Sequence, residues 1–104
     1  MSKSNRVTVD IKNNIEKEYF FELFIYKNTL LSINAIKNIK LILKKYLKNK
    51  FQLIITDVNK IPEAAIKEDI LIMPILIKRN PKPEIRIIGD FTNPKKVLKE
   101  LLIN

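Results

Sequence analysis

Four carboxylates lie close together in the chain and are the first side chains to consider for catalysis or metal binding. They are Asp57, Glu63, Glu68 and Asp69. A carboxylate catalyst or a magnesium site needs several oxygens that converge on one point. Helix capping and surface charge explain these four residues better. The sequence therefore predicts neither a catalytic carboxylate nor a metal site.

The residue types that are missing exclude several classes of chemistry. The chain has no cysteine and no histidine, and its one glycine is Gly89. Without cysteine there are no disulfides, no thiol catalysis and no zinc–cysteine or iron–sulfur sites. Without histidine the usual acid–base group at neutral pH is absent, and one glycine cannot build a glycine-rich phosphate loop of the usual kind. We expect a protein that is not an enzyme and that holds no cofactor.

Aromatic side chains gather in one segment and raise a second possibility, the stacking of single-stranded RNA bases. They are Tyr19, Phe20, Phe21, Phe24 and Tyr26. The segment 19–26 is typical of a central strand with both faces covered by helices, so packing in the core is the favoured interpretation. The glycine-containing aromatic motifs of the common RNA-binding sheet are absent.

The chain is strongly basic, with a net charge of +9. Such a balance favours nucleic acid, an anionic membrane or an acidic protein as partner. Lysine supplies most of the charge, beside Arg6, Arg79 and Arg86, which indicates solvated lysine faces rather than a dedicated polyanion site. No run of about 18 apolar residues and no apolar signal-peptide core are present, so we expect a cytoplasmic protein away from membranes.

The elements that would position these residues follow from the apolar pattern. A length of 104 residues predicts one domain. We expect residues 1–18 to form a leader that is flexible or adds an edge strand, because Val7, Val9 and Ile11 alternate. Residues 19–104 form the domain. Its predicted strands are 19–26, 51–58, 70–79 and 84–88, and its predicted helices are 33–49, 63–69 and 94–103.

The first helix has the clearest pattern, with Ser32 as its expected N-cap. Its expected core-facing stripe is Ile33, Ile36, Ile39, Leu43 and Tyr46 or Leu47. In the last helix, Thr92 or Asn93 is the expected cap and the expected apolar face is Val97, Leu98, Leu101 and Leu102. The order strand, helix, strand, helix, strand, strand, helix predicts an α/β protein with a thioredoxin-like βαβαββα fold in three layers, whose first unit is a right-handed parallel crossover.

Pro74 sits inside an apolar run that otherwise is typical of a strand, although proline cannot donate a ladder hydrogen bond. Thioredoxin-like folds carry a cis proline at the start of the third core strand, and Met73–Pro74 fits that position. Redox members place a pair of cysteines at the start of the first helix. The equivalent segment here, residues 27–32, contains no thiol.

From Tyr19 to Leu102 the sequence resembles the KaiB family. The matching pieces are the aromatic first strand, Asn28-Thr29 with Ser32, Asp57-Val58, Pro62, Met73-Pro74, the proline-rich turn 80–83, the segment Arg86 to Asp90 and Lys96-Val97-Leu98. Lys27, Leu30 and Lys82 depart from the pattern of clock members.

The resemblance implies a protein-binding role. It implies a KaiC-like ATPase as partner, a KaiA-like protein or a sensor histidine kinase as further partners, and assembly into a dimer or tetramer. It places the contact with the ATPase around the second helix, at Lys60, Ala64 and Ala65. It also implies an alternative ground-state fold of the second half, which makes Pro81, Pro83, Gly89 and Asp90 the expected switch region.

Simpler readings of the same residues stay open. Gly89-Asp90 is also compatible with a plain turn at a strand end, and the second helix with an ordinary solvent-facing helix. The role can be circadian or a related timing or stress response. An alternative function is a basic nucleic-acid-binding domain. A degenerate thioredoxin-like enzyme ranks last, since no nucleophile or base is evident.

Overall fold

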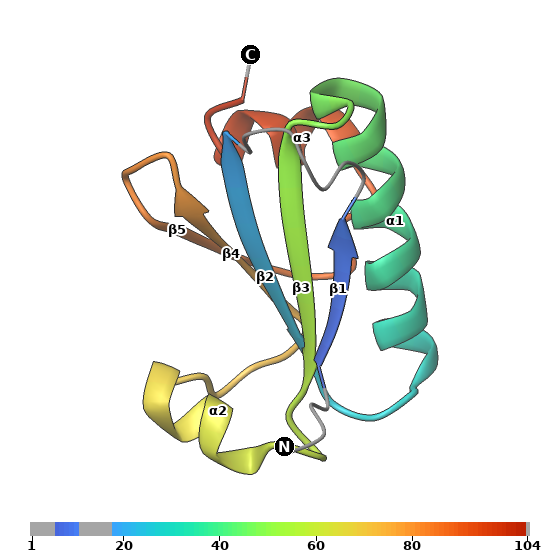
Figure 1. Cartoon of the computed structure of the whole chain (residues 1–104). Helices are drawn as coiled ribbons and strands as arrows, with labels where there is room; N and C mark the ends of the chain where they lie inside the picture. The colour runs from blue at the N-terminus through green and yellow to red at the C-terminus, as the bar shows by residue number, and fades with distance from the viewer. Residues whose placement is uncertain (1–5, 11–17, 104) are drawn as a thin grey trace.

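The computed structural model describes residues 6–10 and 18–103, in which five strands and three helices follow one another (Figure 1). The strands are β1 (Arg6–Asp10), β2 (Tyr19–Ile25), β3 (Phe51–Asp57), β4 (Ile75–Asn80) and β5 (Ile85–Ile88). The helices are α1 (Leu30–Leu47), α2 (Pro62–Glu68) and α3 (Pro94–Glu100). The predicted order of elements from residue 19 onward is confirmed.

The strands form one sheet in the order β1-β3-β2-β4-β5. Strands β2 and β3 are parallel, with Tyr19 opposite Phe51 and Ile25 opposite Asp57, as the predicted crossover through α1 requires. All other pairs are antiparallel. Strand β1 pairs along the outer edge of β3, while Ile11, part of the expected alternation, lies outside the described residues.

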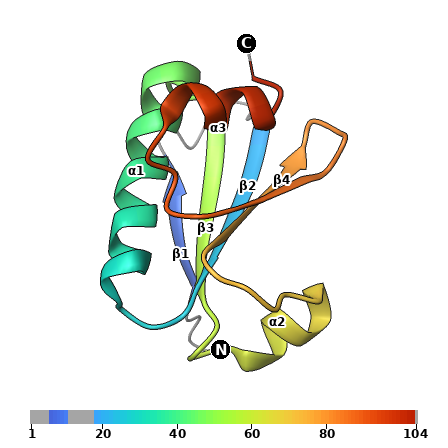
Figure 2. The ribbon, with the colours of Figure 1, turned by 180° about the vertical axis from the view of Figure 1, so that it is seen from behind.

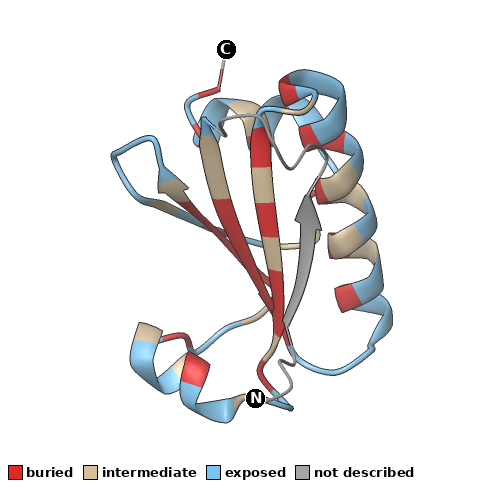
Figure 3. Ribbon diagram, in the orientation of Figure 1, coloured by how far each residue is buried: buried red, intermediate tan, exposed pale blue. Residues whose placement is uncertain are grey.

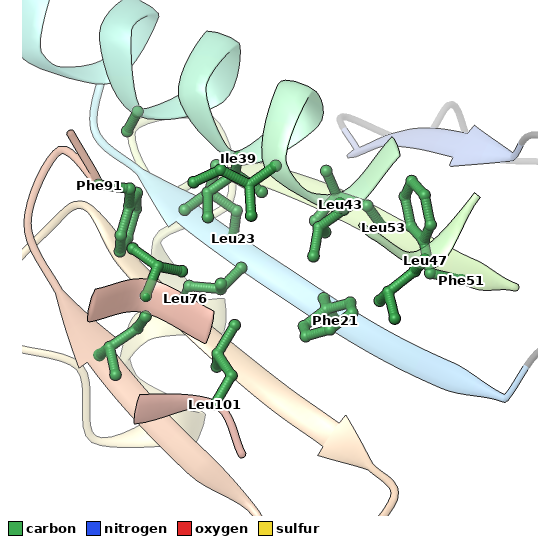
Figure 4. Close-up of a cluster of buried hydrophobic side chains, with 14 of the residues drawn as sticks. Phe21, Leu23, Ile39, Leu43, Leu47, Phe51, Leu53, Leu76, Phe91 and Leu101 are labelled. Carbon is green, nitrogen blue, oxygen red and sulfur yellow. The ribbon is translucent and has the colours of Figure 1, made fainter. Parts of the chain in front are cut away.

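Helices α1 and α3 cover one face of the sheet and α2 lies at the opposite face (Figures 1 and 2). Alternate residues of β2 and β3, such as Phe21, Leu23 and Leu53, pack against Ile39 and other residues of α1 (Figure 4). A smaller cluster behind the sheet joins Phe24 and residues of β4 to α2. Because successive strand residues point to opposite faces, the strands contribute side chains to two apolar layers. Figure 3 shows the buried residues concentrated in the central strands.

The aromatic segment is half-buried at Tyr19 and Phe20 and buried from Phe21 to Ile25. Phe21 and Phe24 are buried on opposite faces of β2, whereas Tyr26 is exposed because the strand ends at Ile25. Tyr19 and Phe21 stack on each other, with ring centroids 6.0 Å apart. No flat row of aromatic rings is left on this strand for bases to stack on, so the favoured interpretation, core packing, agrees with the structure for most of the segment.

Helix α1 begins earlier and faces the core differently than expected. Its N-cap is Thr29, not Ser32, because the Thr29 hydroxyl oxygen accepts a hydrogen bond from the Ser32 backbone N–H at 3.1 Å. The buried stripe is Ser32, Ala35, Ile39, Ile42, Leu43 and Leu47. Ile33 and Tyr46, expected in the core, are exposed. Other apolar residues, among them Leu31, Ile33 and Tyr46, flank the buried stripe, so the apolar pattern alone did not fix which of them face the core.

Thr29 offers a direct test of this helix start. The substitution Thr29→Ala is expected to lower the free energy of unfolding by about 1 kcal/mol, because it removes the cap of the longest helix. Urea unfolding followed by circular dichroism measures the change. Thr92→Ala is the matched control, since Asn93 and not Thr92 caps α3. Equal losses in the two variants would contradict the assigned cap.

Pro74, expected inside the third core strand, lies just before it. Strand β4 begins at Ile75, and residues 70–74 form an irregular segment after α2. The expectation of a strand from residue 70 is therefore wrong, since the chain must turn back from α2 before it enters the sheet. The Met73–Pro74 peptide bond is cis, as predicted, and the bonds before Pro81 and Pro83 are also cis.

Other boundaries shift by one to three residues. Helix α2 ends at Glu68 with Asp69 in a left-handed conformation, and α3 ends at Glu100. Leu102, expected on the apolar face of the last helix, has a positive φ and is exposed. Ile103 is buried in its place, because the chain leaves the helical path after Leu101.

Candidate functional site

Of the three residues expected to bind a partner, Ala64 and Ala65 lie on α2 and Lys60 lies just before it. They differ in how far they are exposed to solvent. Lys60 is exposed, and Ala65 is half-buried. Ala64 is only 5% exposed and packs in the smaller cluster behind the sheet. Ala64 therefore fixes how α2 sits on the sheet, while Lys60 presents its side chain to solvent.

Apolar side chains that sequence reasoning missed lie exposed on and beside α2. They are Ile66 on α2, Leu71 and Ile72 in the segment that follows, and Ile88 on β5. We call these four residues the α2 surface. Two bonds bring β5 to this segment: Arg86 donates to the Glu68 backbone carbonyl at 2.8 Å, and the Gly89 N–H donates to the Pro74 carbonyl at 3.3 Å. Large exposed apolar side chains in one area are typical of a protein-binding surface.

A network of charged side chains holds α2 to the sheet. Arg79 contacts three carboxylates: its Nη2 lies 2.7 Å from Glu22 and 2.9 Å from Glu68, and its Nη1 lies 2.6 Å from Glu84. Arg86 adds a second contact to Glu68 at 3.3 Å. These residues come from β2, β4, β5, α2 and the turn before β5, so one guanidinium links the two halves of the domain.

The pKa of Arg79 reflects two opposing effects. Burial acts to lower it, but hydrogen bonds and charge from Glu22 and Glu68 outweigh burial and raise the pKa above its ordinary value. Arg79 therefore stays charged at every pH at which the protein folds, and the network depends on its carboxylates.

Lys78, the neighbour of Arg79 on β4, points to the opposite face, and burial lowers its pKa below 10.5. In the unfolded chain this lysine binds its proton more tightly, so unfolding takes up protons between the lowered pKa and 10.5. The free energy of unfolding should then rise with pH across that window.

The substitution Lys78→Met should raise the free energy of unfolding at neutral pH and flatten this rise, because the variant carries no charge that burial of this side chain disfavours. Urea unfolding between pH 7 and pH 10.5 measures both effects. Lys95→Met, at an exposed position of α3, is the control and should follow the parent protein. A parallel pH profile for Lys78→Met would argue against this assignment.

The expected switch residues lie along the hairpin and its exit. Pro81 and Pro83 are exposed in the turn between β4 and β5. Gly89 directly follows β5 and has a φ of +136°, a value that other residues rarely adopt. The backbone carbonyl of Asp90 accepts a hydrogen bond from Asn38 on α1 at 2.8 Å, which ties the exit of the hairpin to the first half of the chain.

Gly89→Ala is expected to destabilise the structure by about 1–3 kcal/mol through backbone strain. Space is not the cause, because the nearest atom to an added Cβ is the Phe91 nitrogen at 3.9 Å. Thermal unfolding measures the loss. Asp90→Ala, in the same turn, serves as the control and should stay within about 0.5 kcal/mol, because the hydrogen bond that Asp90 accepts from Asn38 is made by its backbone carbonyl. An unchanged melting temperature for Gly89→Ala would show that the turn relaxes.

The clustered carboxylates do not converge. Asp57 accepts backbone hydrogen bonds from Lys27 and Asn59, at 3.0 and 2.9 Å, while Glu68 pairs with arginines. Within the described ranges 6–10 and 18–103, no group of three acidic side chains is placed to hold a metal ion. None of the helices described is both long and apolar enough to cross a membrane.

Comparisons with known proteins agree with this picture. The KaiB domain model matches residues 22–103. The circadian clock oscillator protein KaiB of Thermostichus vulcanus is 40% identical over 84 residues, which are 81% of this chain and 78% of the relative. That of Rippkaea orientalis is 39% identical over 85 residues, 82% of each chain.

Solved structures confirm the thioredoxin-like fold. The N-terminal domain of Synechococcus elongatus SasA gives a TM-score of 0.66 at 17% identity, over 85% of this chain and 87% of that domain. Fasciola hepatica thioredoxin gives 0.63 at 19% identity, over 84% of this chain and 81% of that protein. These two likenesses show the fold, and the match over residues 22–103 together with the identity to its relatives shows that the chain belongs to the KaiB family.

Proposed function

We propose that this chain is a non-enzymatic, KaiB-like protein-binding module that associates with a KaiC-like ATPase. The observation that carries the proposal is the family match over residues 22–103, joined to relatives named as circadian clock oscillator proteins. The setting is a circadian rhythm or a related timing or stress response in the cytoplasm.

The α2 surface is the proposed docking site. Its four apolar side chains supply the area that a protein interface buries at its centre, and Lys60 supplies a charge at its border. The ion pairs of Arg79 with Glu22 and Glu68 tie α2 to the sheet, so the α2 surface lies on a helix whose position is fixed. A KaiA-like protein or a sensor histidine kinase is proposed as a further partner, and self-association into a dimer or tetramer as the resting state.

Size-exclusion chromatography with light scattering tests the proposal. The purified chain is mixed with a KaiC-like ATPase hexamer and ATP and incubated for hours. We expect co-elution that persists at moderate salt, because a packed interface depends little on counterion release. Failure to form a complex at micromolar concentrations would overturn the proposal.

A basic nucleic-acid-binding domain is the second candidate, favoured by the absence of any acidic residue in α1 and by the net charge of +9. Binding to a polyanion should weaken steeply between low and moderate salt. This alternative would be supported if the affinity for nucleic acid fell steeply with salt and the chain did not bind the ATPase.

We also propose that the second half of the chain refolds between two states, with Pro81, Pro83, Gly89 and Asp90 in the changing region. The family resemblance motivates this, and two packings must then differ by only a few kcal/mol. NMR should show two sets of peaks in slow exchange. A single set under all conditions would count against a second state.

A further inference from the structure

A hollow of about 520 Å³ opens beside α1, and none of the four residues of the α2 surface lines it. Three isoleucines line its apolar part: Ile25, Ile36 and Ile55. Three lysines stand around it: Lys27, Lys40 and Lys60. We call this feature the lysine hollow. Its volume lies within the range of small-molecule sites, about 300–1,000 Å³.

The topology places the lysine hollow where α/β sheets tend to bind ligands. Parallel strands β2 and β3 end side by side at Ile25 and Asp57. After β2 the chain leads to α1 on one face, and after β3 it leads to α2 on the other (Figure 1). Connections that leave neighbouring strands toward opposite faces open a crevice at the carboxyl ends of those strands.

Asp57 fixes the two loops that carry the lysines. One of its carboxylate oxygens accepts hydrogen bonds from the backbone N–H groups of Lys27 and Asn59. Its backbone carbonyl accepts one from the Lys60 N–H at 3.0 Å. The loops after β2 and β3 are thereby tied together, so that Lys27 and Lys60 stand on the same rim.

Charge in the lysine hollow favours an anion. The lining carries three lysines and one acidic residue, Asp57, whose carboxylate is already engaged with backbone N–H groups. The Lys27 ammonium lies 5.6 Å from the centroid of the Tyr26 ring. Lys40 is half-buried on α1, a helix without acidic residues. Lysine is a common phosphate ligand, and the isoleucines suit a flat apolar group.

We propose that the lysine hollow binds a nucleotide-sized organic phosphate, with the phosphates on the lysines and the base against the isoleucines. This site is separate from the α2 surface, so it stands or falls independently of partner binding. Lys60, at the edge of both features, is left unchanged in the test.

Calorimetric titration of the full chain with ADP, without magnesium, tests the proposal. We expect saturable one-to-one binding, and Lys40→Gln should weaken it by about fivefold or more because a charge-assisted contact is lost. Lys44→Gln is the matched control: it removes the same charge from the same helix, outside the lysine hollow, and should change affinity less than about twofold. Circular dichroism checks that both variants fold.

Two further probes separate the parts of the ligand. Adenosine lacks phosphate and should not bind measurably, and inorganic pyrophosphate should bind more weakly than ADP. No saturation by ADP up to about 5 mM, a limit near the weakest useful affinities, would overturn the proposal. So would equal weakening by Lys40→Gln and Lys44→Gln, because ADP would then adsorb to the basic surface as a whole.

Discussion

Replacing Arg79 by methionine is expected to lower the free energy of unfolding by about 3 kcal/mol. This is the lower end of the loss found when one partner of a buried ion pair is removed. The Arg79 side chain is 19% exposed and the Glu22 side chain 10% exposed. Besides the ion pair, the Arg79 Nε donates to Glu22 at 2.8 Å. Without Arg79, the Glu22 carboxylate is left in the smaller apolar layer without a cation among the described residues. Urea unfolding at neutral pH measures the loss.

Three further variants separate the contributions to this network. Arg79→Lys keeps the charge but cannot reach three carboxylates at once, so it should lose an intermediate amount. Glu84→Gln removes the most exposed carboxylate of the three and should cost less than about 1 kcal/mol. Combining Arg79→Met with Glu22→Leu removes both buried charges and should restore much of the stability. If the double variant loses the sum of both single losses, the pair is not coupled as the geometry requires.

Loss of Arg79 should also loosen α2, because the same guanidinium contacts Glu68 at the end of that helix. Hydrogen exchange of the α2 amides should quicken more than that of α1. The effect on α2 connects stability to function, since the proposed docking site lies on this helix and the segment after it.

Sequence patterns were sufficient for the order of elements from residue 19 onward, but they did not place Pro74 before the start of β4. Strand runs such as residues 51–57 alternate or stay apolar. Pro62 and Pro94 mark where α2 and α3 start, and Asn93 caps α3. Each of these signals is local, so neighbouring residues settle it. The rotation of α1 was not settled, because apolar residues lie on both sides of the buried stripe and only the packed sheet selects Ala35 and Ile42.

The charged network and the lysine hollow depend on pairing between distant segments. Glu22 stands out as the one charged residue in an apolar strand, but its partner Arg79 is 57 positions away. Only the antiparallel register of β2 and β4, with Glu22 opposite Ile77, brings the two together. Lys27, Lys40 and Lys60 likewise line one hollow only because β2 and β3 lie side by side in parallel.

Leu71→Asp is expected to weaken binding to a KaiC-like ATPase by at least about tenfold, because a charge replaces an apolar side chain at the centre of the proposed docking site. Leu71 is 92% exposed, so the substitution should leave the melting temperature nearly unchanged. Biolayer interferometry with the immobilised ATPase measures the affinity.

The matched control is Leu41→Asp, on α1 and 60% exposed, which should change affinity less than about twofold. The pair also separates the two candidate functions. Both substitutions add one negative charge to a basic chain, so binding to nucleic acid would weaken in both, and at least as much for Leu41→Asp, which lies on the helix without acidic residues. Only a protein partner that covers the α2 surface would be weakened more by Leu71→Asp than by Leu41→Asp, and equal effects on ATPase binding would place the interface elsewhere on the domain.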